Sequence, residues 1–195
     1  KCLINQREVG PHTLSFNNAT SAKVLDGGNG FADAYGGIPF PIPQSGVEAV
    51  WNHVVRYRGT YVIRRSAEAG VQRNGQYSLV TSQDEALFRF YNPKSNYSEL
   101  NNTLFYYMTF TTAPARLAGN GALVQEMLDQ VKEPRQAWGY NPGQRRVRRA
   151  PTLAYDTPIE ASDGLRTADD TDMYNGAPDR YDWTLVGKRE VYIPY

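Results

Sequence analysis

The sequence predicts an α+β fold: a curved antiparallel sheet or half-open β-barrel covered by two or three helices. Three observations lead to this expectation. Apolar and polar residues alternate over long stretches, the candidate strands follow one another through hairpin turns, and only short segments have helical spacing. The chain has 195 residues, of which 41% are hydrophobic, so we expect a single domain over residues 1–195.

A helix over residues 45–53 has the clearest start signal. Ser45 and Glu48 have the spacing of a capping box, in which each side chain accepts a hydrogen bond from a backbone N–H at the helix start. Val47 and Trp51 then recur at helical spacing with other apolar residues, so the helix has one apolar face.

A period of two follows this helix and predicts the strands of the sheet. From Val55 onward, apolar residues alternate with polar ones, which is typical of a half-buried antiparallel strand. The apolar set is Val55, Tyr57, Tyr61 and Ile63, and the polar set is Arg56, Arg58, Thr60 and Arg64. Asn74-Gly75 is a strong signal for a two-residue hairpin turn. Similar patterns predict further strands over residues 13–16, 77–81, 86–91, 103–112, 144–149 and 183–193.

Two other segments bear on the helix count. Residues 121–132 fit a helix, but residues 124–129 fit equally well a strand paired with residues 137–140, and the sequence leaves both open. Thr167 and Asp170 form a second capping box, and turn-forming residues follow, so a short helix is predicted over residues 168–175.

The charged residues divide the chain into two parts. Residues 1–150 carry 17 basic and 11 acidic side chains, whereas residues 151–195 carry 4 basic and 9 acidic ones. The uniformly basic surface typical of nucleic-acid binding is absent, so no nucleic-acid partner is expected. Instead, we expect the arginines of residues 145–149 to pair with acidic residues of 156–182. No apolar run reaches the ~18 residues of a membrane helix, so no membrane span is expected.

Few residues favour catalysis or metal binding. Cys2 is the single cysteine, and His12 and His53 are the two histidines, which argues against a cysteine-based zinc site or a Ser-His-Asp triad. The Asp-rich segment 163–182 lacks EF-hand spacing, because Asn175 stands where that loop requires glycine; a nonstandard cation site stays open. We therefore expect no catalytic residue, no metal and no cofactor.

The aromatic content, 14 Tyr, 7 Phe and 3 Trp, is the most distinctive feature of the composition. The even-numbered positions of the strand over 103–112 are all apolar through Phe110, so that face either packs in the core or lines a cavity. Core packing is the commoner role, but an open curved sheet would present the same face to an apolar ligand. The candidate ligand-binding residues are Val47, Trp51, Tyr57, Tyr61, Leu104, Tyr106, Met108 and Phe110.

Three long strings of the sequence resemble a single protein family. They are GGIPFPIPQSGVEAVWNHVVRYRG (Gly36–Gly59), WGYNPGQRRVRRAP (Trp138–Pro151) and SDGLRTADDTDMYNGAPDRYDWTLVGKREVYIPY (Ser162–Tyr195). The family is domain of unknown function 1329, a group of exported proteobacterial proteins often described as similar to outer-membrane lipoprotein-sorting proteins. The resemblance spans nearly the whole chain. It implies a periplasmic location and a chain that is a fragment of a longer exported protein.

A weaker similarity, at the level of the fold, extends to the LolA and LolB lipoprotein carriers, which are half-open barrels that hold acyl chains. It implies a non-enzymatic periplasmic protein that binds a lipid or another hydrophobic small molecule in a half-barrel cavity, as a lipid or lipoprotein carrier does. No binding residue is transferred from the carriers, because the matching strings belong to the other family. The alternatives are a protein-interaction component of a cell-envelope complex or transporter, and a polysaccharide or ester hydrolase.

Overall fold

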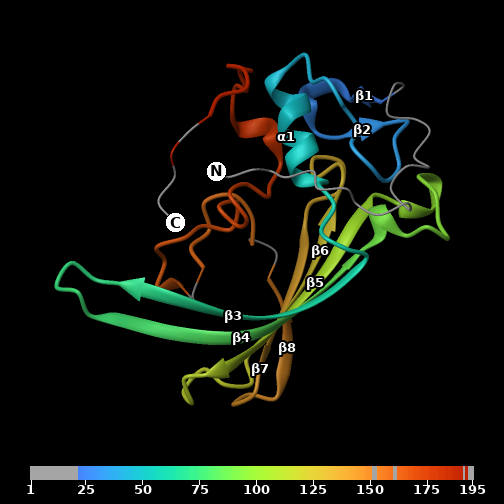
Figure 1. Ribbon diagram of the computed structural model, residues 1–195. Coiled ribbons are helices and arrows are strands. Elements are labelled where there is room, and N and C mark those ends of the chain that lie inside the picture. Colours follow the sequence, from blue (N-terminus) through green and yellow to red (C-terminus); the bar gives the residue numbers. More distant parts are fainter. Residues whose placement is uncertain (1–21, 151–152, 160–161, 191, 193–195) are drawn as a thin grey trace.

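The computed structural model describes residues 22–150, 153–159, 162–190 and 192, and its main element is an open six-stranded antiparallel sheet (Figure 1). The strands lie in sequence order, each beside the next: β3 (Tyr61–Val71), β4 (Tyr77–Phe88), β5 (Thr103–Ala113), β6 (Gly121–Met127), β7 (Gln136–Asn141) and β8 (Arg146–Arg149). A separate two-stranded ribbon consists of β1 (Lys23–Val24) and β2 (Phe31–Ala32). The antiparallel sheet is therefore confirmed, but it does not close into a barrel, because β3 and β8 remain its two edges.

One α-helix, α1 (Gly46–Val54), precedes the sheet and confirms the predicted helix. The Ser45 hydroxyl oxygen accepts a hydrogen bond from the Glu48 backbone N–H at 3.3 Å. The Glu48 carboxylate accepts one from the backbone N–H of Gln44 at 2.6 Å, one residue earlier than a standard capping box. The side chains of Ser45 and Glu48 thus each accept a hydrogen bond from a backbone N–H at the helix start, as their spacing in the sequence indicates.

The expectation of two or three helices is wrong for the described residues, where α1 is the single α-helix. Thr167 does donate to Asp170 at 2.8 Å, but residues 168–175 form turns. Asp172 and Met173 have φ angles of 60° and 75°, and two successive left-handed residues cannot continue a right-handed helix. The remaining helical segments are short 3-10 turns: η2 (Asp26–Gly28), η3 (Arg89–Tyr91), η4 (Ser98–Leu100) and η6 (Pro178–Arg180).

Strand pairing settles the segment that the sequence left open. Residues 121–127 form β6, which pairs with β5 on one side and β7 on the other. The strands predicted over residues 77–81 and 86–91 merge into β4, which ends at Phe88. Residues 183–190 form no strand, so the predicted strand over 183–193 is wrong where the chain is described. The strand predicted over residues 13–16 lies outside the described residues.

The hydrophobic core lies at one end of the sheet, where α1 and the chain before it pack on β4, β5 and the turns beside them. Trp51 and Phe31 are almost fully buried, with ring centroids 5.5 Å apart in an edge-to-face arrangement. Phe90 packs against Phe31 in the same way at 5.7 Å. The aromatic residues thus supply much of the core, as sequence composition favours.

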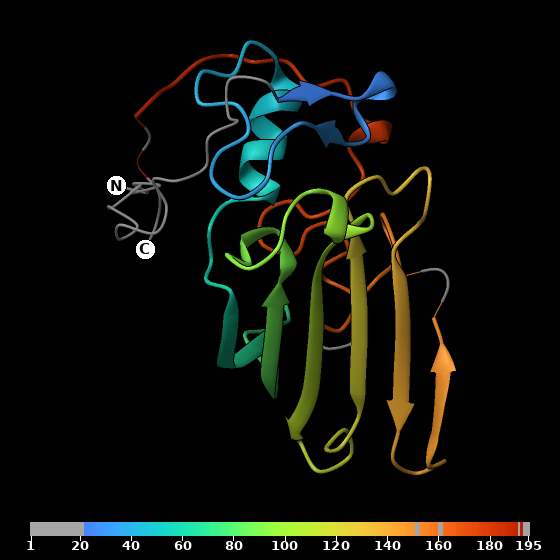
Figure 2. The same cartoon turned by 90° about the vertical axis from the view of Figure 1, so that its right-hand side faces the viewer.

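The two faces of the sheet have different neighbours. Residues directly opposite each other on neighbouring strands share a face, so the pairing register assigns every side chain to one face or the other. Residues 153–159 and 162–183, which we call the C-terminal segment, contact one face, which we call the inner face (Figure 1). In Figure 2 the other face, the outer face, turns toward the viewer, and the C-terminal segment lies behind the strands.

A buried ion pair attaches the C-terminal segment to the sheet. The Arg135 guanidinium donates to the Glu126 carboxylate at 2.8 Å, and both side chains are at most 4% exposed. Asn175 also donates to Glu126, at 3.1 Å, and Arg135 donates to the backbone oxygen atoms of Leu153 and Asn175. The buried Glu126 carboxylate and the buried Arg135 guanidinium therefore both have hydrogen-bond partners in the C-terminal segment.

Replacing Arg135 tests whether this cluster holds the C-terminal segment. Arg135→Leu leaves the Glu126 carboxylate buried without its cation, so we expect the free energy of unfolding to fall by about 3–5 kcal/mol. Arg166→Ala is the control, because Arg166 and Glu68 form a pair that is 31% and 34% exposed; its loss should cost about 1 kcal/mol or less. Urea titrations measure both values. Equal losses would show that the buried cluster has no special role.

Candidate functional site

Three of the eight predicted ligand-binding residues belong to the core end of the structure. Trp51 is 1% exposed, and its indole N–H donates to the backbone oxygen of Gly28 at 2.9 Å. Val47 packs against the same core from α1, and Leu104 is 2% exposed within it. These three side chains therefore pack against other residues of the hydrophobic core.

Tyr57 follows α1 and lies before the sheet begins. Its ring packs edge-to-face on Tyr91 at 5.0 Å, and the residue is 46% exposed. The structure does not bring Tyr57 together with the predicted residues on β5.

The other four predicted residues share the outer face of the sheet. Tyr61 on β3 and Tyr106 on β5 both lie opposite Leu87 on β4, one on each side. Met108 and Phe110 follow Tyr106 on the same face of β5. Their role in binding remains a prediction, but the structure places them on one continuous surface.

Apolar side chains that the sequence did not single out as binding residues extend this surface across the sheet. Met108 lies opposite Leu123, which lies opposite Trp138. In the next row Phe110 lies opposite Gly121, which lies opposite Tyr140. We call the whole set the outer apolar surface; it comprises Tyr61, Ile63, Leu87, Tyr106, Met108, Phe110, Leu123, Trp138, Tyr140 and Val147.

The outer apolar surface is open to solvent within the described part of the chain (Figure 2). Ile63 is 58% exposed, Leu87 47%, and Phe110 43%. Scattered exposed apolar residues are ordinary on a protein surface, but a contiguous patch over several strands marks a site of interaction. This face is therefore the candidate functional site.

Gly121 gives this surface its continuity. A Cβ atom at Gly121 would lie 2.7 Å from Cε1 of the Phe110 ring, closer than real Cβ atoms approach. The ring therefore lies over the glycine backbone on the neighbouring strand. The sequence offered a signal for such a close approach, since a glycine within a strand pattern indicates it.

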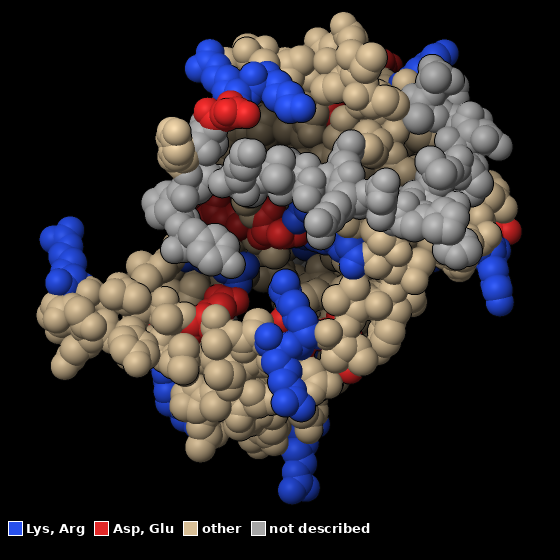
Figure 3. Space-filling view, viewed as in Figure 1, with Lys and Arg blue, Asp and Glu red and all other residues tan. Residues whose placement is uncertain are grey.

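Arg149 borders the outer apolar surface at β8, because it lies opposite Trp138. Arg146 and Arg148 lie opposite inner-face residues of β7 and so start on the inner face. Arg146, Arg148 and Arg149 on this strand and Arg145 in the turn before it are all exposed. Figure 3 shows basic side chains projecting at the lower end of the sheet, where β8 lies in Figure 1.

The expected pairing of these arginines with acidic residues of 156–182 is wrong for the described residues. The acidic groups there form ion pairs with other arginines, namely Arg56, Arg58, Arg135 and Arg180. The reason is topological, because β8 continues the sheet away from the end at which the C-terminal segment contacts α1.

Asp172 connects the C-terminal segment to the residues after α1. Arg56 and Arg58 both form ion pairs with its carboxylate, and Arg58 lies over the Phe88 ring at 4.7 Å. Burial acts to raise the pKa of Asp172, but the two guanidinium groups outweigh it and lower the pKa. His53 Nε2 lies 2.9 Å from the backbone oxygen of Asp172, and burial lowers the pKa of the imidazole. This histidine therefore has a structural hydrogen-bonding role.

The inner face carries a polar cluster around Asp84, which is 2% exposed. Its carboxylate accepts hydrogen bonds from Ser66 at 2.7 Å, Thr109 at 2.7 Å, Arg64 at 2.9 Å and Ser82 at 3.0 Å. Burial acts to raise the pKa of Asp84, but these hydrogen bonds outweigh it and hold the pKa below its ordinary value. The carboxylate is thus saturated with donors and stays ionised, as a structural group does.

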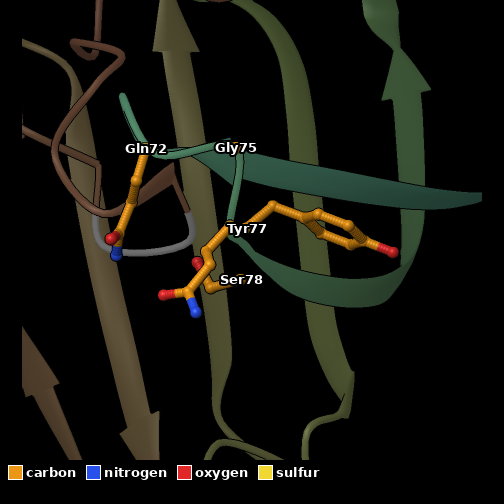
Figure 4. Close-up of a pocket in the computed structure, with 5 residues that line it drawn as sticks. Gln72, Gly75, Tyr77 and Ser78 are labelled. Carbon is orange, nitrogen blue, oxygen red and sulfur yellow. The ribbon is translucent and has the colours of Figure 1, made fainter.

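A recess of about 440 Å³ lies at the turn between β3 and β4 (Figure 4). Gln72, Gly75, Gln76, Tyr77 and Ser78 line it. The Tyr77 ring points away from Gln72, and the amide and hydroxyl groups of Gln72, Gln76 and Ser78 make much of the lining polar. Ser78 already donates to Asp163, so the recess is less suited to an apolar ligand than the outer apolar surface.

The described residues contain neither a cluster arranged to hold a metal ion nor a helix suited to cross a membrane. No group of three His, Cys, Asp or Glu side chains is arranged to hold a metal ion in that part of the chain. Within the same residues, no helix has the length and apolar character needed to cross a membrane. Cys2 and His12 lie outside the described residues.

Comparison with known proteins identifies the family. The family model described as "Protein of unknown function (DUF1329)" matches residues 10–195. The chain belongs to the DUF1329 family. Uncharacterized protein PA3922 from Pseudomonas aeruginosa is 57% identical over 178 residues, which are 91% of this chain but 39% of that protein. The chain therefore spans about two fifths of the length of this relative.

Two solved structures resemble the fold. A DUF1329 family protein from Desulfovibrio piger matches 76% of this chain and 57% of its own, with a TM-score of 0.53 and 18% identity. A domain from Vibrio parahaemolyticus, provisionally described as an outer membrane lipoprotein-sorting protein domain, matches 71% of this chain and 51% of its own, with a TM-score of 0.49 and 15% identity. The first of these supports the architecture described above.

Replacing Asp84 tests the polar cluster of the inner face. Asp84→Asn removes the charge that four donors stabilise, so we expect a loss of about 2–3 kcal/mol in the free energy of unfolding at neutral pH. Because the folded-state pKa is lowered, the contribution of Asp84 is present above its ordinary pKa of 3.8 and is lost as the pH falls through the lowered value. Urea titrations should therefore show that the difference in unfolding free energy between the unaltered protein and Asp84→Asn is smaller at about pH 3 than at neutral pH. A difference independent of pH would contradict this assignment.

Proposed function

We propose that this chain is a non-enzymatic periplasmic binding component that holds a hydrophobic ligand, such as the acyl chain of a lipid, on the outer apolar surface. The observation that carries the proposal is the contiguous exposure of aromatic and aliphatic side chains on β3 to β8. Sequence patterning predicts a ligand in a half-barrel cavity. The C-terminal segment contacts the inner face, and the proposed binding surface is accordingly the opposite face.

The energetics favour an extended acyl chain as the ligand. Burying one contributes about 0.8 kcal/mol per methylene group. Flat aromatic rings such as Trp138 and Phe110 offer large contact areas with few rotatable bonds, so little entropy is lost when a chain lies across them. A carrier role, in which the ligand is taken up and released, fits a surface that is open rather than enclosed.

A protein partner is the second candidate for the same surface. The observation that favours it is that, among the residues the structure describes, no strand pairs with the outer side of β3 or of β8, and an edge strand can accept a further strand. A cell-envelope complex or transporter would supply such a partner. The hydrolase alternative gains less support, because the buried carboxylates of Asp84 and Glu126 are each saturated by structural hydrogen bonds.

Placing a charge within the outer apolar surface tests the proposal. Leu123 is 38% exposed, so Leu123→Glu should leave the fold intact and weaken the binding of a fluorescent fatty acid by roughly tenfold, or about 1.4 kcal/mol. Leu165→Glu is the matched control, because Leu165 is 70% exposed and lies in the C-terminal segment.

Fluorescence titration measures both affinities, and circular dichroism confirms that both variants fold. The control variant should bind like the unaltered protein. If neither the unaltered protein nor the control binds the fatty acid, the surface has another occupant and the protein-partner candidate takes precedence.

A further inference from the structure

Arg149 on β8 stands next to the outer apolar surface and has no ion-pair partner among the described residues. The ion pairs of that part of the chain involve other basic groups, although Arg145, Arg146, Arg148 and Arg149 are all exposed. We propose that Arg149, on this arginine-rich edge, binds the anionic headgroup of a lipid whose acyl chain lies on the outer apolar surface. The inference rests on the proposed function and names the class of its ligand.

The pairing register places a cation at the end of an apolar row. Met108, Leu123 and Trp138 lie opposite one another on β5, β6 and β7, and Trp138 lies opposite Arg149 on β8. Opposite residues share a face, so the Arg149 side chain starts on the outer face beside the Trp138 ring. An amphiphile that lies along this row meets apolar side chains first and a guanidinium group last.

The dimensions of this row suit one acyl chain. Neighbouring strands are about 4.8 Å apart, so the three strand spacings from Met108 to Arg149 cover roughly 14 Å. Half the hydrocarbon thickness of a bilayer is about 15 Å, which is the depth that one acyl chain fills.

The other end of the same row disfavours an anion. Met108 lies opposite Glu85 on β4, and the Tyr61 hydroxyl donates to the Glu85 carboxylate at 2.6 Å. The row therefore runs from a carboxylate on β4 to a guanidinium on β8. This polarity directs a negatively charged headgroup toward Arg149, because like charges at the β4 end repel it.

Charge complementarity decides among the possible occupants of this surface. A second copy of the chain would bring its own four arginines to the shared edge, and like charges there oppose association. A phosphate group, by contrast, accepts paired hydrogen bonds from a guanidinium group, which is the geometry that arginine favours. An anionic lipid therefore satisfies both the apolar and the basic part of the site.

Two single-chain lipids with the same acyl chain test the proposal. Lysophosphatidylglycerol is anionic and lysophosphatidylcholine is zwitterionic, and both are titrated into the protein below their micelle-forming concentrations by calorimetry. We expect the anionic lipid to bind roughly tenfold more tightly at low salt. The preference should shrink as salt screens the exposed charges.

Arginine variants then locate the headgroup. Arg149→Gln should weaken binding of the anionic lipid roughly fivefold and leave the zwitterionic affinity unchanged. Arg73→Gln is the matched control, because Arg73 is exposed in the distant turn between β3 and β4 and carries the same charge. The control should leave both affinities unchanged.

The outcomes separate this inference from the function on which it rests. Equal binding of the two lipids, unaffected by Arg149→Gln, overturns the headgroup assignment and leaves the proposed function standing. Failure of both lipids to bind overturns the proposed function as well. Analytical ultracentrifugation at the titration concentrations tests whether a second copy of the chain occupies the surface instead. A dimer that persists in excess lipid would assign the outer face to a second copy and overturn the proposal.

Discussion

The buried ion pair between Glu126 and Arg135 is the interaction on which the arrangement of the two sheet faces depends. Removing two opposite charges from water is costly, and the cost is recovered only when geometry and additional hydrogen bonds satisfy both groups. Here those additional partners come largely from the C-terminal segment, through Leu153 and Asn175. Because the pair is complete only with the segment in place, the inner face is covered and the outer face is left to other contacts.

The distribution of polarity over the sheet is the reverse of the usual one. An antiparallel sheet with one solvated face normally buries its apolar side and exposes its polar side. Away from the core end, this sheet instead holds Asp84 and its four donors on the inner face, while aromatic side chains such as Phe110 lie on the outer face. This reversed polarity marks the outer face as the candidate site of interaction.

Local signals predicted local structure well. The Ser45 cap, the hairpin at Asn74-Gly75 and the alternation over β3 each depend on residues close in the chain, and each is found in the structure. The hairpin loop holds three residues, 73–75, where two were predicted, and the strand begins at Tyr61 and not at Val55. What the sequence left open or predicted wrongly involves partners distant in the chain. Residues 121–127 became a strand because β5 and β7 lie on either side, and the C-terminal turns follow contacts to Arg56, Arg58 and Arg135. Alternation on β5 grouped Tyr106, Met108 and Phe110 correctly, but only the register could add Leu123 and Trp138 to them.

The open edges of the sheet have a consequence for how the protein behaves at high concentration. An unpaired strand is a template for another strand, and a chain with an exposed apolar sheet is prone to grow into fibrils by edge-to-edge addition. On β8 three of four residues are arginine, and β3 carries Arg64 and Arg65. Copies that approached edge to edge would bring these cations together. The chain can therefore expose an apolar sheet face and still resist polymerisation.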